Sequence, residues 1–148
     1  MKVVVQRVKS AKVTRQEDNK VVGEIKGGLF LLLGIKKGDT EKQVDELVNK
    51  MLKLRVMSDE NDKMNLSVQE TKSEILLVSQ FTLYANTKDG NRPSFIEAEE
   101  PTKANVLYEY VISKLKKGSG LNIQTGSFGD YMKIEAELDG PVTIVLES

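Results

Sequence analysis

The chain has 148 residues, the length of one ordinary domain, and contains neither cysteine nor histidine. Their absence excludes disulfides, thiol nucleophiles, Ser-His-Asp catalysis and the usual Cys- or His-ligated zinc and iron sites. Any chemistry must come from other polar side chains, from peptide groups or from the substrate, so we expect no metal and no cofactor. The lack of cysteine also fits a reducing compartment, and we expect a cytoplasmic protein.

Charge is balanced over the whole chain but uneven along it. Lys plus Arg and Asp plus Glu each number 22, which argues against tight, nonspecific binding of polyanions over a large surface. Residues 1–58 carry 13 basic and 7 acidic side chains, whereas residues 59–148 carry 9 basic and 15 acidic ones. This distribution allows either a basic face built from the first half, or charges that become mixed when the two halves fold together.

The first half of the chain predicts strands followed by one helix. A β-rich segment opens the chain, and the polar cluster at 17–19 predicts a turn between its two strands. The apolar run Leu29–Ile35 has the length of a strand that is buried on both faces. Thr40 and Gln43 fit a capping box at the start of a helix. The apolar stripe of this helix consists of Val44, Leu47, Val48, Met51 and Leu54.

The second half predicts another buried strand and a second helix. The strand covers Ile75–Val78 and runs directly into the polar segment that begins at Ser79. Pro101 suits the first position of the helix, and Gly118 is expected to close it. The apolar stripe of this helix consists of Ala104, Leu107, Val111 and Leu115.

The last part of the chain predicts two strands joined by a turn. Residues 132–138 alternate between apolar and charged side chains, which is typical of a strand with one wet face. Asp139-Gly140-Pro141 predicts the turn, and residues 142–146 the final strand. We therefore expect a single α/β domain over residues 1–148, with about eight strands in mixed sheets or a barrel and two amphipathic helices. No apolar stretch is long enough for a signal peptide or a membrane span, so no membrane partner is expected.

Two short segments are candidates for a functional site. Ser79-Gln80-Phe81-Thr82 follows a buried strand, so a rigid sheet would hold its hydroxyl and amide groups in place. An ordinary strand with one wet face gives the same pattern. Gly140-Pro141-Val142-Thr143 is typical of a plain turn when it is read alone.

With these two segments included, the chain closely resembles the D-aminoacyl-tRNA deacylase family of the bacterial and eukaryotic type. The matching segments appear in order and span nearly the whole chain. They are Val4–Val8, Leu54-Arg55, Lys63–Ser67, Val78–Leu83, Asn91–Phe95, Thr125–Gly129 and Gly140–Thr143. Two departures affect loops: Asp130-Tyr131 stands where the family commonly has alanine after Phe-Gly, and Leu138-Asp139 stands where it commonly has Asn-Asp.

The resemblance implies a homodimer that removes D-amino acids from the 3′ end of wrongly charged tRNA, as proofreading for translation. Ser79–Thr82 of one subunit is implied to line the pocket. Gly140-Pro141 of the other subunit is implied to enter it with a cis peptide bond, and Arg7 to help hold that dipeptide. A rigid backbone there would refuse L-aminoacyl esters, whereas glycyl-tRNA mischarged on tRNA-Ala would also be cleaved.

Two mechanisms are open for ester hydrolysis without histidine. In the first, the Thr82 hydroxyl attacks the ester or directs water. In the second, the neighbouring ribose 2′-hydroxyl positions the water, and Thr82 and Gln80 only shape the pocket. We favour the second because no general base is available to activate Thr82. In either mechanism, peptide N–H groups near Phe81 and Thr82 can stabilise the oxyanion.

The remaining expectations concern RNA binding and the rival functions. Phe95, with the loop Asn91–Ser94, is a candidate for gripping the terminal adenine by stacking, although core packing explains a phenylalanine equally well. One rival function is a nucleic-acid-binding accessory protein with no catalytic role. Another is a related proofreader of a different mischarged tRNA.

Overall fold

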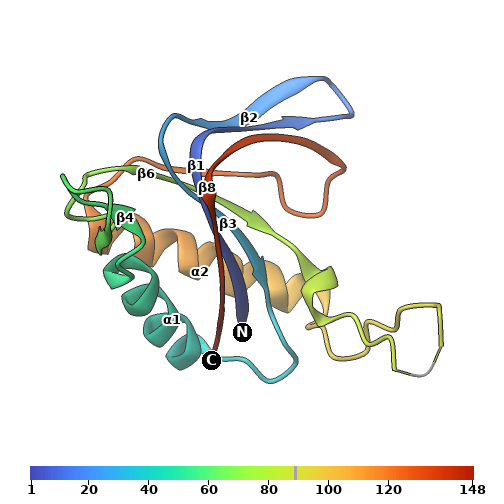
Figure 1. Cartoon of the computed structure of the whole chain (residues 1–148). Helices are drawn as coiled ribbons and strands as arrows, with labels where there is room; N and C mark the ends of the chain where they lie inside the picture. Colours follow the sequence, from blue (N-terminus) through green and yellow to red (C-terminus); the bar gives the residue numbers. More distant parts are fainter. Residues whose placement is uncertain (89) are drawn as a thin grey trace.

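A mixed sheet forms the centre of the computed structural model, which describes residues 1–88 and 90–148. Its strand order is β2-β1-β3-β6-β7, with β8 paired on β1, and β4 and β5 form a separate pair (Figure 1). The strands are β1 (Lys2–Arg15), β2 (Lys20–Ile25), β3 (Gly28–Gly34), β4 (Met57–Ser58), β5 (Met64–Leu66), β6 (Glu74–Ser79), β7 (Ile123–Thr125) and β8 (Met132–Glu147). The pairs β3–β6 and β6–β7 are parallel, whereas β1 is antiparallel to its three neighbours.

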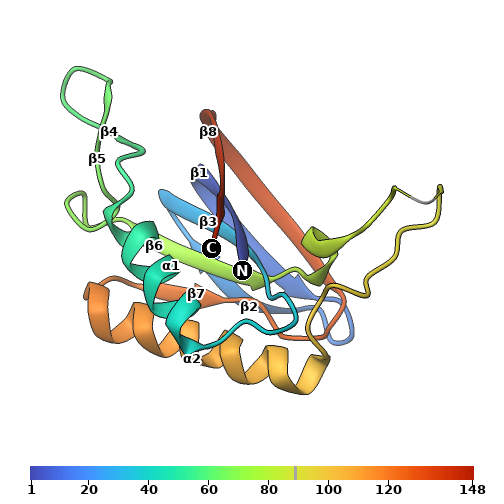
Figure 2. The ribbon, with the colours of Figure 1, turned by 90° about the horizontal axis from the view of Figure 1, so that it is seen from below.

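Two helices, α1 (Glu41–Lys53) and α2 (Pro101–Ser119), lie together against one face of the sheet (Figure 2). The capping box at the start of α1 and the proline at the start of α2 are confirmed. The expected end of α2 was wrong, because Gly118 remains helical and Gly120 ends the helix with a left-handed φ of 68°. Within the stripe of α1, buried Leu52 takes the place expected for Leu54, which caps the helix.

Both faces of the central strands are buried, each in its own apolar core. On β3 and β6, Leu31, Leu33, Ile75 and Leu77 pack against the two helices. Their neighbours point to the opposite face and join a second core. That second core consists of Val8, Ala11, Val13, Ile25, Phe30, Leu76 and Val78. This double burial is what the uninterrupted apolar runs predicted.

The second core is enclosed because the sheet curls on itself into a nearly closed barrel. Strand β2 passes over β7, and Gly23 of β2 lies directly against the main chain of Thr125. A Cβ atom on Gly23 would lie 2.4 Å from the carbonyl oxygen of Thr125, so only glycine permits this crossing. The barrel-like arrangement of strands and two helices agrees with the predicted fold class.

Strand β8 is one long strand, not two strands joined by a turn as expected. Its pairing with β1 runs from Met132 to Glu147 but shifts register around Arg7. Gln6 pairs with Thr143 and Val8 pairs with Leu138, so residues 139–142 bulge out of the ladder opposite Arg7. Asp139, Gly140 and Pro141 therefore form a bulge within a continuous edge strand.

The pairing of β1 with β8 also explains the uneven charge along the sequence. Basic side chains from the first half meet acidic side chains from the second half across this ladder, so the charges of the two halves are mixed there. The pairs are Lys2–Glu147, Arg7–Asp139, Lys9–Glu137 and Lys12–Glu135. Within the described residues, neither helix has the length and apolar character that crossing a membrane demands.

Candidate active site

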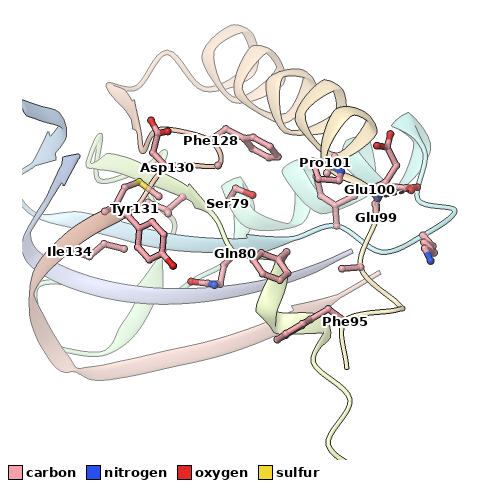
Figure 3. Close-up of a pocket in the computed structure, with 18 residues that line it drawn as sticks. Ser79, Gln80, Phe95, Glu99, Glu100, Pro101, Phe128, Asp130, Tyr131 and Ile134 are labelled. Carbon is pink, nitrogen blue, oxygen red and sulfur yellow. Dashed lines mark hydrogen bonds between the residues drawn. The ribbon is translucent and has the colours of Figure 1, made fainter. Parts of the chain in front are cut away.

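A cavity of about 750 Å³ opens where β6 ends (Figure 3). Ser79, Gln80 and Phe81 line it from the end of this strand. The start of α2 and the segment 128–132 line it from other directions, so three parts of the chain that are far apart in sequence meet here. Apolar and aromatic side chains dominate the lining, as is usual for small-molecule sites.

The chain changes conformation within the Ser79–Thr82 motif. Ser79 is the last residue of buried β6, and the peptide N–H of Gln80 still bonds to the Leu33 carbonyl at 2.7 Å. A short 3₁₀ helix, η1 (Phe81–Tyr84), begins directly after it. The first N–H groups of such a helix have no partner inside it. The peptide N–H groups of Phe81 and Thr82 therefore stand as donors at the edge of the cavity.

The hydrogen bonding of Thr82 indicates whether its hydroxyl can be activated as a nucleophile. Its side chain is exposed, does not line the cavity and accepts a 2.6 Å hydrogen bond from Gln80 Nε2. A neutral amide cannot take a proton, so Gln80 cannot act as the base for a Thr82 nucleophile. Within the described chain, the Thr82 hydroxyl has no hydrogen bond to a carboxylate or an amine.

Phe95 stands at the rim of the cavity and outside both cores. Its ring meets the Phe81 ring edge-on, with the ring centres 5.0 Å apart. Phe81 is 55% exposed and Phe95 is 37% exposed. Core packing therefore does not explain Phe95, and both rings present surface to a molecule that enters the cavity.

The start of α2 brings a buried carboxylate to the cavity. The Glu99 side chain is only 5% exposed, and it accepts hydrogen bonds from the N–H groups of Glu100 and Gly38. These bonds, the first above all, and the Lys103 ammonium hold the pKa of Glu99 below its usual range. Glu100 caps α2 by accepting bonds from two peptide groups of the first turn. Glu99 and Glu100 thus fix the start of α2, which lines this side of the cavity.

The segment Phe128–Met132 lines one side of the cavity, and no role in the site was predicted for it from the sequence. It reaches the cavity because the short strand β7 pairs with β6, and the N–H of Gly126 bonds to the Leu77 carbonyl at 2.9 Å. A strand of three residues carries no readable periodicity. The side chain of Asp130 then bonds to the Ser127 hydroxyl and lies 3.7 Å from Arg15, which fixes the loop.

Arg7, Gly140 and Pro141 form a second cluster on β1 and β8 and do not line the cavity of their own chain. The Gly140–Pro141 peptide bond is cis. Both residues are exposed at the outer edge of the sheet. Of the predicted site residues, the structure thus brings Ser79, Gln80, Phe81 and Phe95 to one cavity, keeps Thr82 beside it and holds the other three apart.

A family model described as D-Tyr-tRNA(Tyr) deacylase matches residues 4–147. The chain belongs to this family. The membership confirms the predicted family and the predicted class of enzyme, a hydrolase. The D-aminoacyl-tRNA deacylases of Aquifex aeolicus and Thermosipho melanesiensis are 53% and 49% identical to this deacylase. Each match covers 100% of this chain, and 98% and 97% of the relatives, respectively.

Two solved structures share the fold of this deacylase. One, titled "c-Myc DNA Unwinding Element Binding Protein", is 42% identical with a TM-score of 0.92 and covers 100% of this chain and 99% of its own. The other is titled a probable eukaryotic D-amino acid tRNA deacylase. It is 15% identical with a TM-score of 0.86 and covers 98% of this chain and 97% of its own, so it supports the fold alone.

Proposed function

We propose that this deacylase hydrolyses the ester bond between a D-amino acid and the terminal ribose of tRNA, in the cytoplasm. The products are the free D-amino acid and the tRNA, and the role is proofreading for translation. The observation that carries the proposal is the family match over nearly the whole chain. The cavity beside the Ser79–Thr82 motif offers a site for the 3′ end of the substrate.

The cavity suits a terminal nucleoside. Its volume of about 750 Å³ lies within the range of pockets that bind small ligands. The exposed rings of Phe81 and Phe95 offer surfaces on which an adenine can stack, an interaction worth about 1–3 kcal/mol per base. Ser79 and Gln80 would then lie close to the ribose and the ester.

In the proposed reaction the substrate itself supplies the group that orients the attacking water. The ribose 2′-hydroxyl lies next to the ester and orients the attacking water, while the N–H groups of Phe81 and Thr82 stabilise the oxyanion. One such donor is worth about 10²–10³ in rate. The C–O bond to the ribose 3′-oxygen breaks, and that oxygen takes a proton as the D-amino acid leaves. Gln80 shapes the pocket around these atoms, and Thr82 supports it by accepting a hydrogen bond from the Gln80 amide.

We propose that a second copy of the chain completes the site. Gly140 and Pro141 are exposed and do not line the cavity of their own chain, so a role in the site requires them to come from a partner. Rejection of L-aminoacyl esters by about 10⁴-fold needs roughly 5.5 kcal/mol. Backbone atoms of the bulge would occupy the space of an L side chain and bind the α-amino group. Glycyl-tRNA, with no side chain to reject, is then also a substrate, including glycine mischarged on tRNA-Ala.

The proposal is tested by steady-state release of amino acid from D-tyrosyl-, L-tyrosyl- and glycyl-tRNA. We expect the D-tyrosyl and glycyl esters to be cleaved, and kcat/KM for the L-tyrosyl ester to be about 10⁴-fold lower than for the D-tyrosyl ester. An inert glycyl ester would count against rejection by backbone alone. A preference for a mischarged L-aminoacyl-tRNA would favour the related proofreader.

Filling the cavity should weaken binding of the 3′ end. Ala104 lines the cavity from α2, and we expect Ala104→Phe to raise KM for D-tyrosyl-tRNA at least tenfold, about 1.4 kcal/mol of lost binding. Val106→Phe is the matched control, because Val106 lies on the same helix, is 64% exposed and does not line the cavity. Equal kinetics in the two variants would contradict this use of the cavity.

A second candidate function is nucleic-acid binding without catalysis, because one solved relative carries a title that names DNA binding. The zero net charge, and the pairing of Lys2 and Lys12 of β1 with acids of β8, argue against tight, nonspecific binding of DNA. Titration of a labelled DNA duplex at low and physiological salt separates the two functions. Tight, salt-resistant binding with no ester hydrolysis would favour the second.

A further inference from the structure

We infer that Asp139 and Ser58 are positioning residues that fix the Gly140–Pro141 bulge through Arg7, and that they thereby set how strictly L-aminoacyl esters are refused. The inference rests on the proposed function, in which this bulge reads the chirality of the substrate in the partner's cavity. The inference assigns a role in the site to the Asp139 carboxylate and to the Ser58 hydroxyl. Because Ser58 lies on β4, the β4–β5 hairpin then also supports the site.

The bulge needs an anchor because the sheet does not supply one. Residues 139–142 lie between two paired stretches of β8, opposite the single residue Arg7 of β1. Bulged residues lose their ladder partners. Gly140 itself has a φ of 125°, and both Gly140 and Pro141 are exposed. The position of the bulge therefore depends on side-chain contacts.

Arg7 makes these contacts, and its side chain is only 11% exposed. Its Nε donates to the Asp139 carbonyl at 3.3 Å and lies 2.9 Å from Asp139 Oδ2. Its Nη2 lies against Gly140, 3.5 Å from where a Cβ atom would stand. The guanidinium thus contacts both the main chain and the side chain of Asp139, the first residue of the bulge. It also packs against Gly140, the second residue.

The other side of the guanidinium is fixed by the segment that opens the β4–β5 hairpin. Arg7 Nη1 donates to the Val56 carbonyl at 2.9 Å and to Ser58 Oγ at 3.2 Å. A planar guanidinium with donors engaged on two sides has one orientation. The Asp139 carboxylate, the guanidinium and the Ser58 hydroxyl therefore form one connected support for the bulge.

This support should govern selectivity more than rate. A D-aminoacyl ester leaves the space in front of the bulge empty, so a small outward shift of the bulge costs it little. An L-aminoacyl ester needs that space, so the same shift admits it. Sites that discriminate by shape depend on residues that lock their geometry.

The test compares kcat/KM for D-tyrosyl-tRNA and L-tyrosyl-tRNA in the full-length protein. We expect Asp139→Ala and Asp139→Asn to lower the D-to-L ratio about tenfold, chiefly through faster cleavage of the L ester, and Ser58→Ala to lower it about threefold. Glu135→Gln is the matched control, because it breaks another β1–β8 pair, Lys12–Glu135 at 3.5 Å, away from the bulge. Its ratio should equal that of the wild type.

Melting temperature and sedimentation verify that each variant is folded and associated as the wild type is. If Asp139→Ala unfolds, Asp139→Asn and Ser58→Ala decide the question. An unchanged ratio in these variants, or an equal fall in both rates, overturns the inference. If the wild type itself leaves D-tyrosyl-tRNA intact, the proposed function fails instead, so the two failures are distinguishable.

Discussion

Replacing the 2′-hydroxyl of the terminal ribose by hydrogen should lower kcat/KM for D-tyrosyl-tRNA by at least about 100-fold, the scale of a lost general acid–base contribution. Thr82→Ala should lower it less than about tenfold. The reason lies in the surroundings of Thr82, whose hydroxyl is bonded to the Gln80 amide at 2.6 Å. An amide positions a hydroxyl but cannot activate it.

The two changes are compared under single-turnover conditions, so that tRNA release does not mask the chemical step. Gln80→Ala in the same assay measures how much the amide contributes to the shape of the pocket. An inactive Thr82→Ala variant, together with normal cleavage of the 2′-deoxy ester by the wild type, would reverse the assignment and make Thr82 the nucleophile or the group that directs water.

Gly140→Ala is expected to lower kcat/KM for D-tyrosyl-tRNA at least about 100-fold, because it distorts the bulge internally and displaces the backbone atoms that are proposed to bind the α-amino group, and a displacement of about 1 Å at a site can cost that much. At a φ of 125°, a side chain is strained. A Cβ atom on Gly140 would also stand 2.9 Å from Val142 Cγ2 and 3.0 Å from the Val142 nitrogen. The bulge must shift to relieve these contacts.

Gly120→Ala is the matched control for this substitution. Gly120 also has a positive φ, of 68°, but no atom of the described residues lies within 4 Å of the position of its Cβ atom, and it ends α2 away from the cavity. We expect it to lower the melting temperature and leave the kinetics unchanged. If Gly140→Ala hydrolyses D-tyrosyl-tRNA as fast as Gly120→Ala does, the bulge has no role in the reaction.

Sequence patterns predicted those parts of the fold that rest on periodicity. The apolar runs at 29–35 and 75–78 became the buried strands β3 and β6, and Thr40 with Gln43 began α1. The resemblance pointed to Ser79–Phe81 and Phe95, which meet at one cavity. Local patterns succeed here because hydrophobic periodicity and capping motifs involve residues that are close together in the chain.

The sequence predictions failed for features that depend on contacts between residues far apart in the chain. The turn expected at Asp139-Gly140-Pro141 is a bulge, because pairing with β1 continues on both sides of it. The wall at 128–132 was missed because β7 has only three residues. Glu99 was overlooked because one of its hydrogen-bond donors, the Gly38 N–H group, is 61 positions earlier in the chain. The spacing of residues along the sequence does not predict such long-range contacts.

Complementation between two defective subunits tests the shared site most directly. An Ala104→Phe chain keeps its bulge and loses its cavity, whereas a Gly140→Ala chain keeps its cavity and loses its bulge. Co-expression with two affinity tags allows the mixed dimer to be purified and its release of D-tyrosine measured. A site built from two subunits predicts about half of the wild-type activity per dimer, since one of the two composite sites is intact. A mixed dimer that is no more active than the homodimers of the two variants, or a chain that stays monomeric, would contradict the shared site.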